Sequence, residues 1–376
     1  MITKRDMMRK FAFLAAVTLL CLPLSAQRVK KYDEVVSDAS DARITWVGRT
    51  KTDGGTVSFD WSGVYARIAF EGDLLRVKAS DSKKDYFNLW IDKEMDAEPD
   101  RIVTLTGQDT TIVLFQGGNP KEKHTAILQK RTEGEQGTAT FTCFETLKPL
   151  LQAEGVRERV IEFIGDSYTC GFGSENSVKT DPFKPETENA NKSYAPIVSR
   201  YFGADCIWIS HSGMGIARNY NDNVKGYYMP ERYLQTFDTV HEADWKPENG
   251  PKPSLSVIYL CTNDFSRSRQ PSLEVFRKNY CTLIKEIKDF YGGDHPILCV
   301  AGKNDPQMIT YIQAAVEACG YPNVHWMALG ARVHNHEGDL GAANHPNYVG
   351  HQKKAYTLIP YISTIMDWPL TGAPVR

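Results

Sequence analysis

One serine in this chain stands where a nucleophile is expected. The mostly apolar residues 160–164 end at Gly165, and Ser167 follows two residues later. A strand that ends in a tight glycine turn presents the next side chains at the carboxyl edge of a sheet, where open α/β folds bind their ligands. A serine at this edge attacks a carbonyl carbon if a histidine accepts its proton and N–H groups stabilise the oxyanion. Taken alone, Gly-Asp-Ser fits a plain strand-to-loop turn equally well.

Three further segments supply the other groups that this chemistry needs. Gly213 follows the apolar residues 206–209, and Asn263 follows the apolar residues 255–260. His345 precedes a helical pattern near the C-terminus. Because the carboxyl ends of parallel strands meet at one edge of a sheet, we expect these groups to converge there.

The four residues divide the work of ester hydrolysis between them. Ser167 would attack the carbonyl carbon, and His345 would take its proton and pass it to the leaving alcohol. The backbone N–H groups of Ser167 and Gly213, with the side-chain amide of Asn263, would form the oxyanion hole. Glycine suits the middle position because its N–H approaches the substrate without a Cβ in the way.

Each of these residues also has a structural explanation. Ser167 or Asn263 could cap a helix, and Gly213 could serve a plain turn. His345 could be a solvated histidine before a helix, although His351 is the better candidate for that role. Three neighbours are expected to have structural or supporting roles: Asp166, His211 and Asp264.

Two domains are expected to position these residues. At 376 residues the chain exceeds the length that a single hydrophobic core usually supports. Residues 28–150 read as an all-β sandwich or jelly roll, because short strands separated by turn signals recur about every ten residues. After a short linker at 149–157, residues 158–370 alternate strands with helices. That alternation predicts a three-layer α/β domain with a five-stranded parallel sheet.

The periodicity also predicts where the individual elements lie. In the first domain, strands are predicted at 43–50, 56–61, 65–71, 74–79, 86–91, 101–106, 111–116, 124–131 and 138–145. In the second domain, strands are predicted at 159–164, 205–210, 255–261, 296–301 and 324–329. Helices are predicted near 193–202, 271–291, 306–319 and 347–366.

The four catalytic blocks, in this order, resemble the signature blocks of the SGNH (GDSL-type) hydrolases. A β-rich module containing residues 57–63 (Val-Ser-Phe-Asp-Trp-Ser-Gly) and 88–92 (Asn-Leu-Trp-Ile-Asp) precedes them. Together they make the chain similar to carbohydrate esterase family two. That family consists of secreted acetyl esterases that act on acetylated plant polysaccharides such as xylan and glucomannan, often at the 6-hydroxyl of hexoses. The resemblance implies a jelly-roll first domain and a serine mechanism with no cofactor and no metal.

The chain departs from the SGNH pattern at two positions. Ala342 stands where an Asp usually precedes the catalytic histidine by three residues, and the nearest upstream acid is Asp339. Members of the family that this chain resembles work with a Ser-His dyad in which a backbone carbonyl orients the imidazole, so we expect a dyad of Ser167 and His345. The second departure is Cys261, which replaces the usual glycine of the Gly-x-Asn-Asp block.

The N-terminus and the charge balance indicate where the protein acts. Residues 1–26 combine a basic start, an apolar stretch and the small residues Ser25 and Ala26, which predicts a signal peptide and an exported protein. Cys21 lacks the preceding small residues of a lipoprotein signal, so lipid anchoring is not expected. With 44 basic and 46 acidic residues and no basic block, nothing indicates a nucleic-acid partner. No membrane span is expected in the mature chain.

Seven of the eight cysteines lie beyond the predicted signal peptide. They are scattered along the chain, and most are expected to be small buried hydrophobic residues. No Cys-x-x-Cys or His/Cys cluster has metal-ligand spacing, so no structural zinc site is expected.

The segment 219–249 is long and rich in aromatic residues. Their rings could stack on sugars or simply pack the insertion, and the sequence does not decide between the two. These aromatic residues are Tyr220, Tyr227, Tyr228, Tyr233 and Trp245.

The leading hypothesis is an exported carbohydrate acetyl esterase that removes O-acetyl groups from xylan, glucomannan or their oligosaccharides. A lipase or thioesterase of the same superfamily is the first alternative, and it would favour an apolar acyl pocket. The second alternative is a carbohydrate-binding protein on an inactive hydrolase scaffold. Ala342, in place of the usual Asp, and Cys261 support this second alternative. A protein that only binds carbohydrate, however, needs none of the four catalytic blocks.

Overall fold

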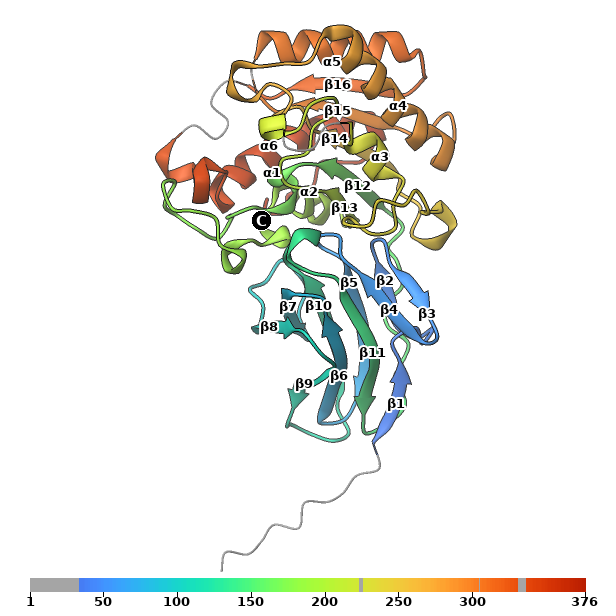
Figure 1. Cartoon of the computed structure of the whole chain (residues 1–376). Coiled ribbons are helices and arrows are strands. Elements are labelled where there is room, and N and C mark those ends of the chain that lie inside the picture. Colours follow the sequence, from blue (N-terminus) through green and yellow to red (C-terminus); the bar gives the residue numbers. More distant parts are fainter. Residues whose placement is uncertain (1–33, 223–225, 304, 331–335) are drawn as a thin grey trace, which may run out of the picture. The chain divides into compact units, whose positions relative to one another are not determined.

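The computed structural model describes residues 34–222, 226–303, 305–330 and 336–376. Glu34–Arg376 form one compact unit, in which an all-β half precedes an α/β half along the chain (Figure 1). The predicted signal peptide and Cys21 lie outside the described residues.

The first half is a β-sandwich of two antiparallel sheets, drawn from blue to green in Figure 1. One sheet has six strands: β1 (Val35–Asp38), β3 (Lys51–Asp53), β4 (Thr56–Phe59), β6 (Leu74–Asp81), β9 (Thr110–Gln116) and β11 (Ala139–Thr146). The other has five strands: β2 (Thr45–Val47), β5 (Tyr65–Glu71), β7 (Lys84–Ile91), β8 (Arg101–Thr106) and β10 (Lys123–Lys130).

Alternation of apolar and polar residues explains the sandwich. Along β6, every second side chain from Leu75 onward is buried, as expected for a strand with one face toward a core. Aromatic rings from three strands fill the space between the sheets. The ring centroids of Phe59 and Phe141 lie 5.3 Å apart, and that of Phe87 lies 5.7 Å from Phe141. Such pairs contribute beyond their buried area.

The predicted strand at 43–50 is wrong in detail. The chain forms β2, turns at Gly48 and only then forms β3. Gly48 has a φ of 113°, and a Cβ built there would lie 2.7 Å from the Cγ2 atom of Val64. The glycine therefore ends the strand. The structure also contains β1, a four-residue strand that pairs with β11 and whose short pattern gives little periodicity to detect.

The second half is a parallel sheet with helices, which confirms the predicted fold class. Its strand order is β13-β12-β14-β15-β16, and all recorded pairings are parallel. The strands are β12 (Val160–Gly165), β13 (Asp205–Ser210), β14 (Leu255–Tyr259), β15 (Ile297–Ala301) and β16 (Val324–Ala328). The helices are α1 (Ser167–Cys170), α2 (Tyr194–Tyr201), α3 (Met229–Tyr233), α4 (Leu273–Tyr291), α5 (Pro306–Cys319) and α6 (Tyr348–Met366).

Helices cover the parallel sheet in pairs. Helix α2 packs with α6, and α4 packs with α5. None of the described helices is both long and apolar enough to cross a membrane. Strand β12 lies between β13 and β14, so the chain leaves it first to one side and later to the other. This is the switch point of a doubly wound sheet, where ligands bind beyond the strand ends.

A disulfide bond joins Cys281 of α4 to Cys319 of α5, whose Cα atoms lie 5.4 Å apart. The sequence alone did not reveal this pair, because only the packing of the two helices brings the residues together. The remaining cysteines of the described chain are buried thiols, as expected: Cys143, Cys170, Cys206, Cys261 and Cys299.

The sandwich and the α/β half share buried polar contacts. Arg49 follows β2, and its guanidinium donates to the carbonyl of Gln235 at 2.7 Å. The hydroxyl of Tyr65 donates to the Asp205 carboxylate at 2.7 Å, and the indole N–H of Trp61 donates to the carbonyl of Thr236 at 2.9 Å. Buried polar groups are costly unless paired. These contacts therefore fix how the two halves meet.

Candidate active site

Ser167 is the first residue of helix α1, directly beyond the end of β12. Asp166 caps this helix, because its carboxylate accepts a hydrogen bond from the Tyr168 N–H at 3.1 Å. Gly165 leaves no space for a side chain, since a Cβ there would lie 1.9 Å from the Thr169 hydroxyl oxygen. The turn is therefore tight, and it presents Ser167 at the carboxyl edge of the sheet. Asp166 has the structural role expected for it.

His345 reaches Ser167 from the C-terminal part of the chain. Its Nε2 atom lies 2.9 Å from the Ser167 hydroxyl oxygen, and its Nδ1 atom lies 3.1 Å from the carbonyl oxygen of Ala343. A carbonyl oxygen only accepts hydrogen bonds, so Nδ1 must carry the proton in the neutral ring. Nε2 is then left as the acceptor for the serine hydroxyl. The geometry holds the tautomer that a general base needs.

No carboxylate of the described chain takes the usual place beside His345. Asp339 pairs instead with Lys353, with both carboxylate oxygens 2.7 Å from the ammonium. Ala342 is fully buried, and its Cβ packs against Gly173. The orienting carbonyl belongs to Ala343, whose φ of 52° lies in the left-handed region that favours glycine. A locally strained backbone thus aims that carbonyl at the imidazole.

Burial sets the protonation state of His345. Loss of hydration lowers its pKa from 6.5 to about 4, and this outweighs the opposing hydrogen bonds to the backbone of Ala343 and Ala342. The positive charges of Lys303 and Lys354 lower it further. The imidazole is therefore neutral, and able to accept a proton, over most of the pH range.

A buried lysine lies beneath the nucleophile turn. The Lys354 ammonium lies 4.7 Å from the ring centre of Tyr168 and donates to the hydroxyl of Tyr259. Burial lowers the pKa of Lys354 to about 7. Burial also raises the pKa of Asp166 to about 7, although the charge of Lys354 opposes that shift. No pattern in the sequence marked this lysine, because Lys354 looks like an ordinary residue on the polar face of a helix.

Gly213 is the third residue of a tight turn. The turn is closed by a hydrogen bond from the Met214 N–H to the His211 carbonyl at 3.2 Å, and Gly213 has a φ of 79°. A positive φ at the third residue is the mark of a type II turn, and it requires glycine. Within the described chain, no group accepts a hydrogen bond from the N–H of Gly213 or of Ser167. Both N–H groups are therefore available to a ligand.

Asn263 connects these two turns. Its amide nitrogen donates to the Met214 carbonyl at 2.8 Å and, over a longer 3.3 Å, to the Asp166 carboxylate. Contact with an oxyanion requires the longer bond to open, which the sequence could not reveal. Asp264 accepts from the N–H groups of three successive residues and so fixes the loop after Gly213, as expected for a structural role: Ile216, Ala217 and Arg218.

His351 is not the solvated histidine that the sequence predicted. It is fully buried on α6, and its Nδ1 atom accepts a hydrogen bond from the Tyr194 N–H at 3.3 Å. The reason is helical periodicity, because His351 lies on the same buried face as Ala355, Leu358 and Ile362. His211 is also buried, and its Nδ1 atom lies 2.9 Å from the Asp238 carboxylate.

The aromatic residues of segment 219–249 have different surroundings. Tyr233 and Trp245 are buried, and their ring centres each lie 4.8 Å from the Arg49 guanidinium carbon. These two rings therefore pack the insertion. Tyr220 is 41% exposed, and its N–H donates to the Gly213 carbonyl at 2.8 Å. Arg267 covers the Tyr220 ring at 5.1 Å, which leaves this ring at the edge of the site.

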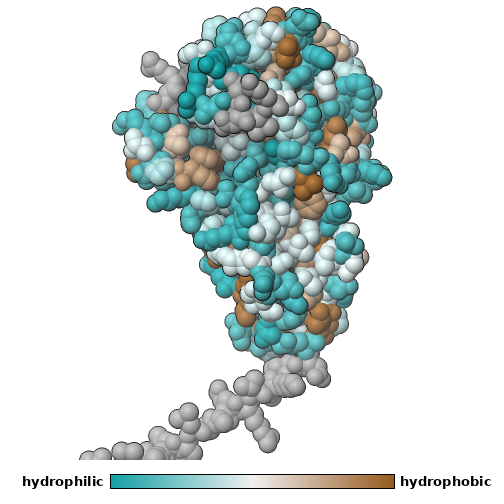
Figure 2. Space-filling model, viewed as in Figure 1, coloured by the Kyte–Doolittle hydropathy of each residue, from teal (hydrophilic) through white to brown (hydrophobic). Residues whose placement is uncertain are grey.

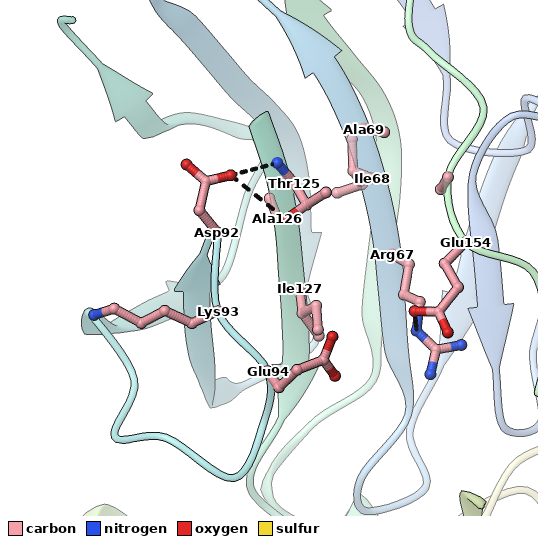
Figure 3. Close-up of a pocket in the computed structure, with 11 residues that line it drawn as sticks. Arg67, Ile68, Ala69, Asp92, Lys93, Glu94, Thr125, Ala126, Ile127 and Glu154 are labelled. Carbon is pink, nitrogen blue, oxygen red and sulfur yellow. Dashed lines mark hydrogen bonds and ion pairs between the residues drawn. The ribbon is translucent and has the colours of Figure 1, made fainter. Parts of the chain in front are cut away.

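A separate hollow of about 320 Å³ lies on the five-stranded sheet of the sandwich (Figure 3). Its floor is formed by β5 and β10, and charged side chains stand around it. Arg67 pairs there with Glu154 at 3.7 Å, and Asp92 accepts from the Thr125 N–H at 2.8 Å. The four predicted site residues are not among those that line this hollow.

Comparison with known proteins finds relatives of both halves of the chain. Residues 46–153 match the carbohydrate esterase 2 N-terminal family, and residues 163–353 match the GDSL-like lipase/acylhydrolase family. The cellulase/esterase CelE of Acetivibrio thermocellus is 30% identical over 325 residues, which is 82% of this chain but 38% of CelE. An acetylxylan esterase / glucomannan deacetylase of Cellvibrio japonicus is 26% identical over 88% of this chain and 91% of that protein.

The fold has a solved counterpart. A family two carbohydrate esterase from Clostridium thermocellum, solved in complex with cellohexaose, superposes with a TM-score of 0.78 at 28% identity. The match covers 87% of this chain and 100% of that one. The chain therefore belongs to the GDSL-like lipase/acylhydrolase family and joins that hydrolase domain to the N-terminal domain of carbohydrate esterase family two.

Proposed function

We propose that this protein is an exported carbohydrate acetyl esterase that works through a Ser167–His345 dyad. The observation that carries the proposal is the chain of two hydrogen bonds from Ser167 to His345 to the Ala343 carbonyl, at 2.9 and 3.1 Å. Nucleophile, base and orienting group stand in the order that acyl transfer requires. A carbonyl replaces the usual carboxylate in the third position.

The reaction follows from these positions in two steps. The Ser167 oxygen attacks the acetyl carbonyl carbon while Nε2 of His345 takes the hydroxyl proton. The oxyanion faces the N–H groups of Ser167 and Gly213, and the Asn263 amide joins them once its bond to Asp166 opens. The tetrahedral intermediate then expels the sugar alkoxide, which receives the proton from His345 and leaves an acetyl-serine.

Water completes the cycle by the same route. His345 takes a proton from a water molecule, whose oxygen attacks the acetyl carbon. Collapse of the second intermediate returns the proton to the Ser167 oxygen and releases acetate. Each group ends in its starting state.

The substrate is inferred from the relatives and from the polarity of the molecule. The Cellvibrio relative is named for acetylxylan and glucomannan, and the Clostridium thermocellum structure holds cellohexaose. Arg267 covers one face of the partly exposed Tyr220 ring beside Gly213, and the other face offers a surface on which a sugar ring can stack. The face seen in Figure 2 is mostly hydrophilic, with only scattered apolar residues. These features favour O-acetylated xylan or glucomannan, or their oligosaccharides, over a lipid.

Export is part of the proposal. The basic and apolar residues 1–26 have the composition of a signal peptide. The disulfide between Cys281 and Cys319 supports it, because such bonds persist in oxidising compartments.

The test compares acyl chain lengths in wild type and two variants. We expect the wild type to hydrolyse 4-nitrophenyl acetate faster than the butyrate and octanoate esters, and to release acetate from acetylated glucomannan. Ser167→Ala and His345→Ala should each lose at least about a thousandfold in kcat. Preference for octanoate would instead indicate a lipase. Equal rates in wild type and Ser167→Ala would show that the serine does not act and would leave a binding protein.

A further inference from the structure

A buried carboxylate of the sandwich half touches both sides of the candidate active site. Glu133 lies in the loop that joins β10 to β11 within the sandwich, and it is 2% exposed. One of its carboxylate oxygens accepts a hydrogen bond from the Ser212 N–H at 2.7 Å. The same oxygen accepts from the Cys170 thiol at 3.6 Å.

Both partners of Glu133 lie next to the reacting groups. Ser212 is the residue before Gly213, inside the turn whose glycine N–H faces the oxyanion. Cys170 ends helix α1, three residues after Ser167. A single carboxylate thus joins the oxyanion turn to the nucleophile helix.

The loop that carries Glu133 is itself fixed. The buried Lys130 ammonium, at the end of β10, donates to the carbonyl of Thr132 at 2.8 Å and to that of Glu133 at 3.0 Å. It also pairs with the buried Asp85 carboxylate at 2.8 Å. The Glu133 carboxylate therefore stands on a rigid support that belongs to the sandwich.

A second carboxyl group completes the cluster. The Glu133 N–H donates to the Glu188 carboxyl at 3.3 Å. One carboxyl oxygen each from Glu133 and Glu188 and the Cys170 sulfur all lie within 4.8 Å of one another. Burial, assisted by the charge of Glu133, raises the pKa of Glu188 well above its ordinary value. Burial also raises the pKa of Cys170, which keeps it a thiol that can donate. The cluster then holds Glu133 as the acceptor.

We infer that Glu133 is a positioning residue through which the sandwich half holds the oxyanion turn in its catalytic geometry. The inference rests on the proposed esterase function. The Ser212 N–H is bound from one side by Glu133, and the Met214 carbonyl is bound from the other by Asn263. The short segment 212–214, which contains Gly213, is thereby held at both of its ends. Loss of one end lets this N–H turn away from the oxyanion.

The test separates catalysis from folding by measuring kcat and KM on 4-nitrophenyl acetate. Glu133→Ala should lower kcat about tenfold or more, with KM within about twofold, because the oxyanion forms only after binding. Glu133→Gln keeps an acceptor oxygen for the Ser212 N–H and should stay within about threefold of wild type. Glu122→Ala, an exposed change just before β10 and at the opposite end of that strand from Glu133, is the control and should leave kcat unchanged.

Inhibition by a tetrahedral transition-state analogue gives a second measurement, which would not change if Glu133 only stabilised the fold. Methylboronic acid binds covalently to the serine oxygen and places a boronate oxygen in the oxyanion hole. Its inhibition constant should rise in Glu133→Ala by the same factor by which kcat falls. If Glu133→Ala does not fold, Glu133→Asp withdraws the carboxylate by one methylene and should show the same paired loss, of smaller size.

Wild-type kcat and boronate inhibition in a folded Glu133→Ala or Glu133→Asp would overturn the inference. A fall in melting temperature with both values unchanged would show that Glu133 only stabilises the fold. Ser167→Ala distinguishes failure of the proposed function, because activity that survives this change would mean that no serine esterase is being measured.

Discussion

Among the single residues, the orientation of His345 by a neutral carbonyl instead of a charged carboxylate distinguishes this site. The Ala343 carbonyl orients His345 as a carboxylate would, but it adds no negative charge beside the ring. The imidazole is therefore held in the right tautomer without the raised pKa that an ion pair gives. The pH dependence of the reaction follows directly from this difference.

As the pH falls, kcat/KM should decline only at an unusually low pH. Because burial lowers the pKa of His345 to about 4, its neutral form persists as the pH falls and is lost only near pH 4. We expect kcat/KM to stay level from about pH 5.5 to 6.5, below the pKa of about 7 of the neighbouring Asp166 and Lys354, since this ratio reports the free enzyme. The measurement is hydrolysis of a neutral acetate ester across this range. A midpoint near 6.5 would mean that an ordinary, hydrated histidine is the base.

The nearest upstream acid should be dispensable for catalysis. Asp339 pairs with Lys353 and does not approach His345, so Asp339→Asn should keep kcat within about twofold. The melting temperature should fall slightly, because Lys353 loses its partner. A loss of kcat approaching that of His345→Ala would show that Asp339 belongs to a triad that forms during turnover.

At the scale of elements, strand ends determine where the chemistry occurs. Ser167 and Asn263 follow β12 and β14, and these strands were predictable because their apolar runs end at turn residues. Ser167 and His345 could be predicted from their types and their order in the chain. The bonding of Asn263 and the burial of His351 could not, since each depends on how an element faces its neighbours.

The turn after β14 contains a residue under backbone strain. Cys261 has a φ of 85° and is fully buried. Cys261→Gly relieves a left-handed conformation that costs roughly 1–2 kcal/mol, and this offsets the lost burial of the thiol. Cys261→Ala keeps the strain and still loses the sulfur. We expect urea unfolding to give a higher free energy of unfolding for the glycine variant than for the alanine variant. The reverse order would show that the observed φ is not strained.

At the scale of the whole molecule, the sandwich supports the catalytic half. Arg49, Tyr65 and Glu133 enter the α/β half from the sandwich, and none of them was recognisable from the sequence. Sequence motifs indicate where strands end, but they do not reveal contacts between two surfaces that meet only after folding. The resemblance predicted both domains, but the sequence left open whether the first one reaches the site.

Gly63 tests how closely the two halves are coupled. It has a φ of 72°, and a Cβ there would lie 2.3 Å from a ring carbon of Trp208. Gly63→Ala should lower the free energy of unfolding by at least about 3 kcal/mol, through strain and overpacking. Gly54→Ala is the matched control, because Gly54 also has a positive φ but nothing lies within 4 Å of the added atom. Equal losses in the two variants would show that the Gly63 contact does not couple the halves.

In the proposed mechanism, Ser167 carries the acetyl group during turnover. The most direct measurement is acid quenching of the enzyme within milliseconds of mixing with 4-nitrophenyl acetate, followed by mass spectrometry of its peptides. We expect one acetyl group, on the peptide that contains Ser167, and none on that peptide in Ser167→Ala. Turnover with the acetyl group on another residue, or with no acetyl-enzyme under conditions where release limits the rate, would contradict it.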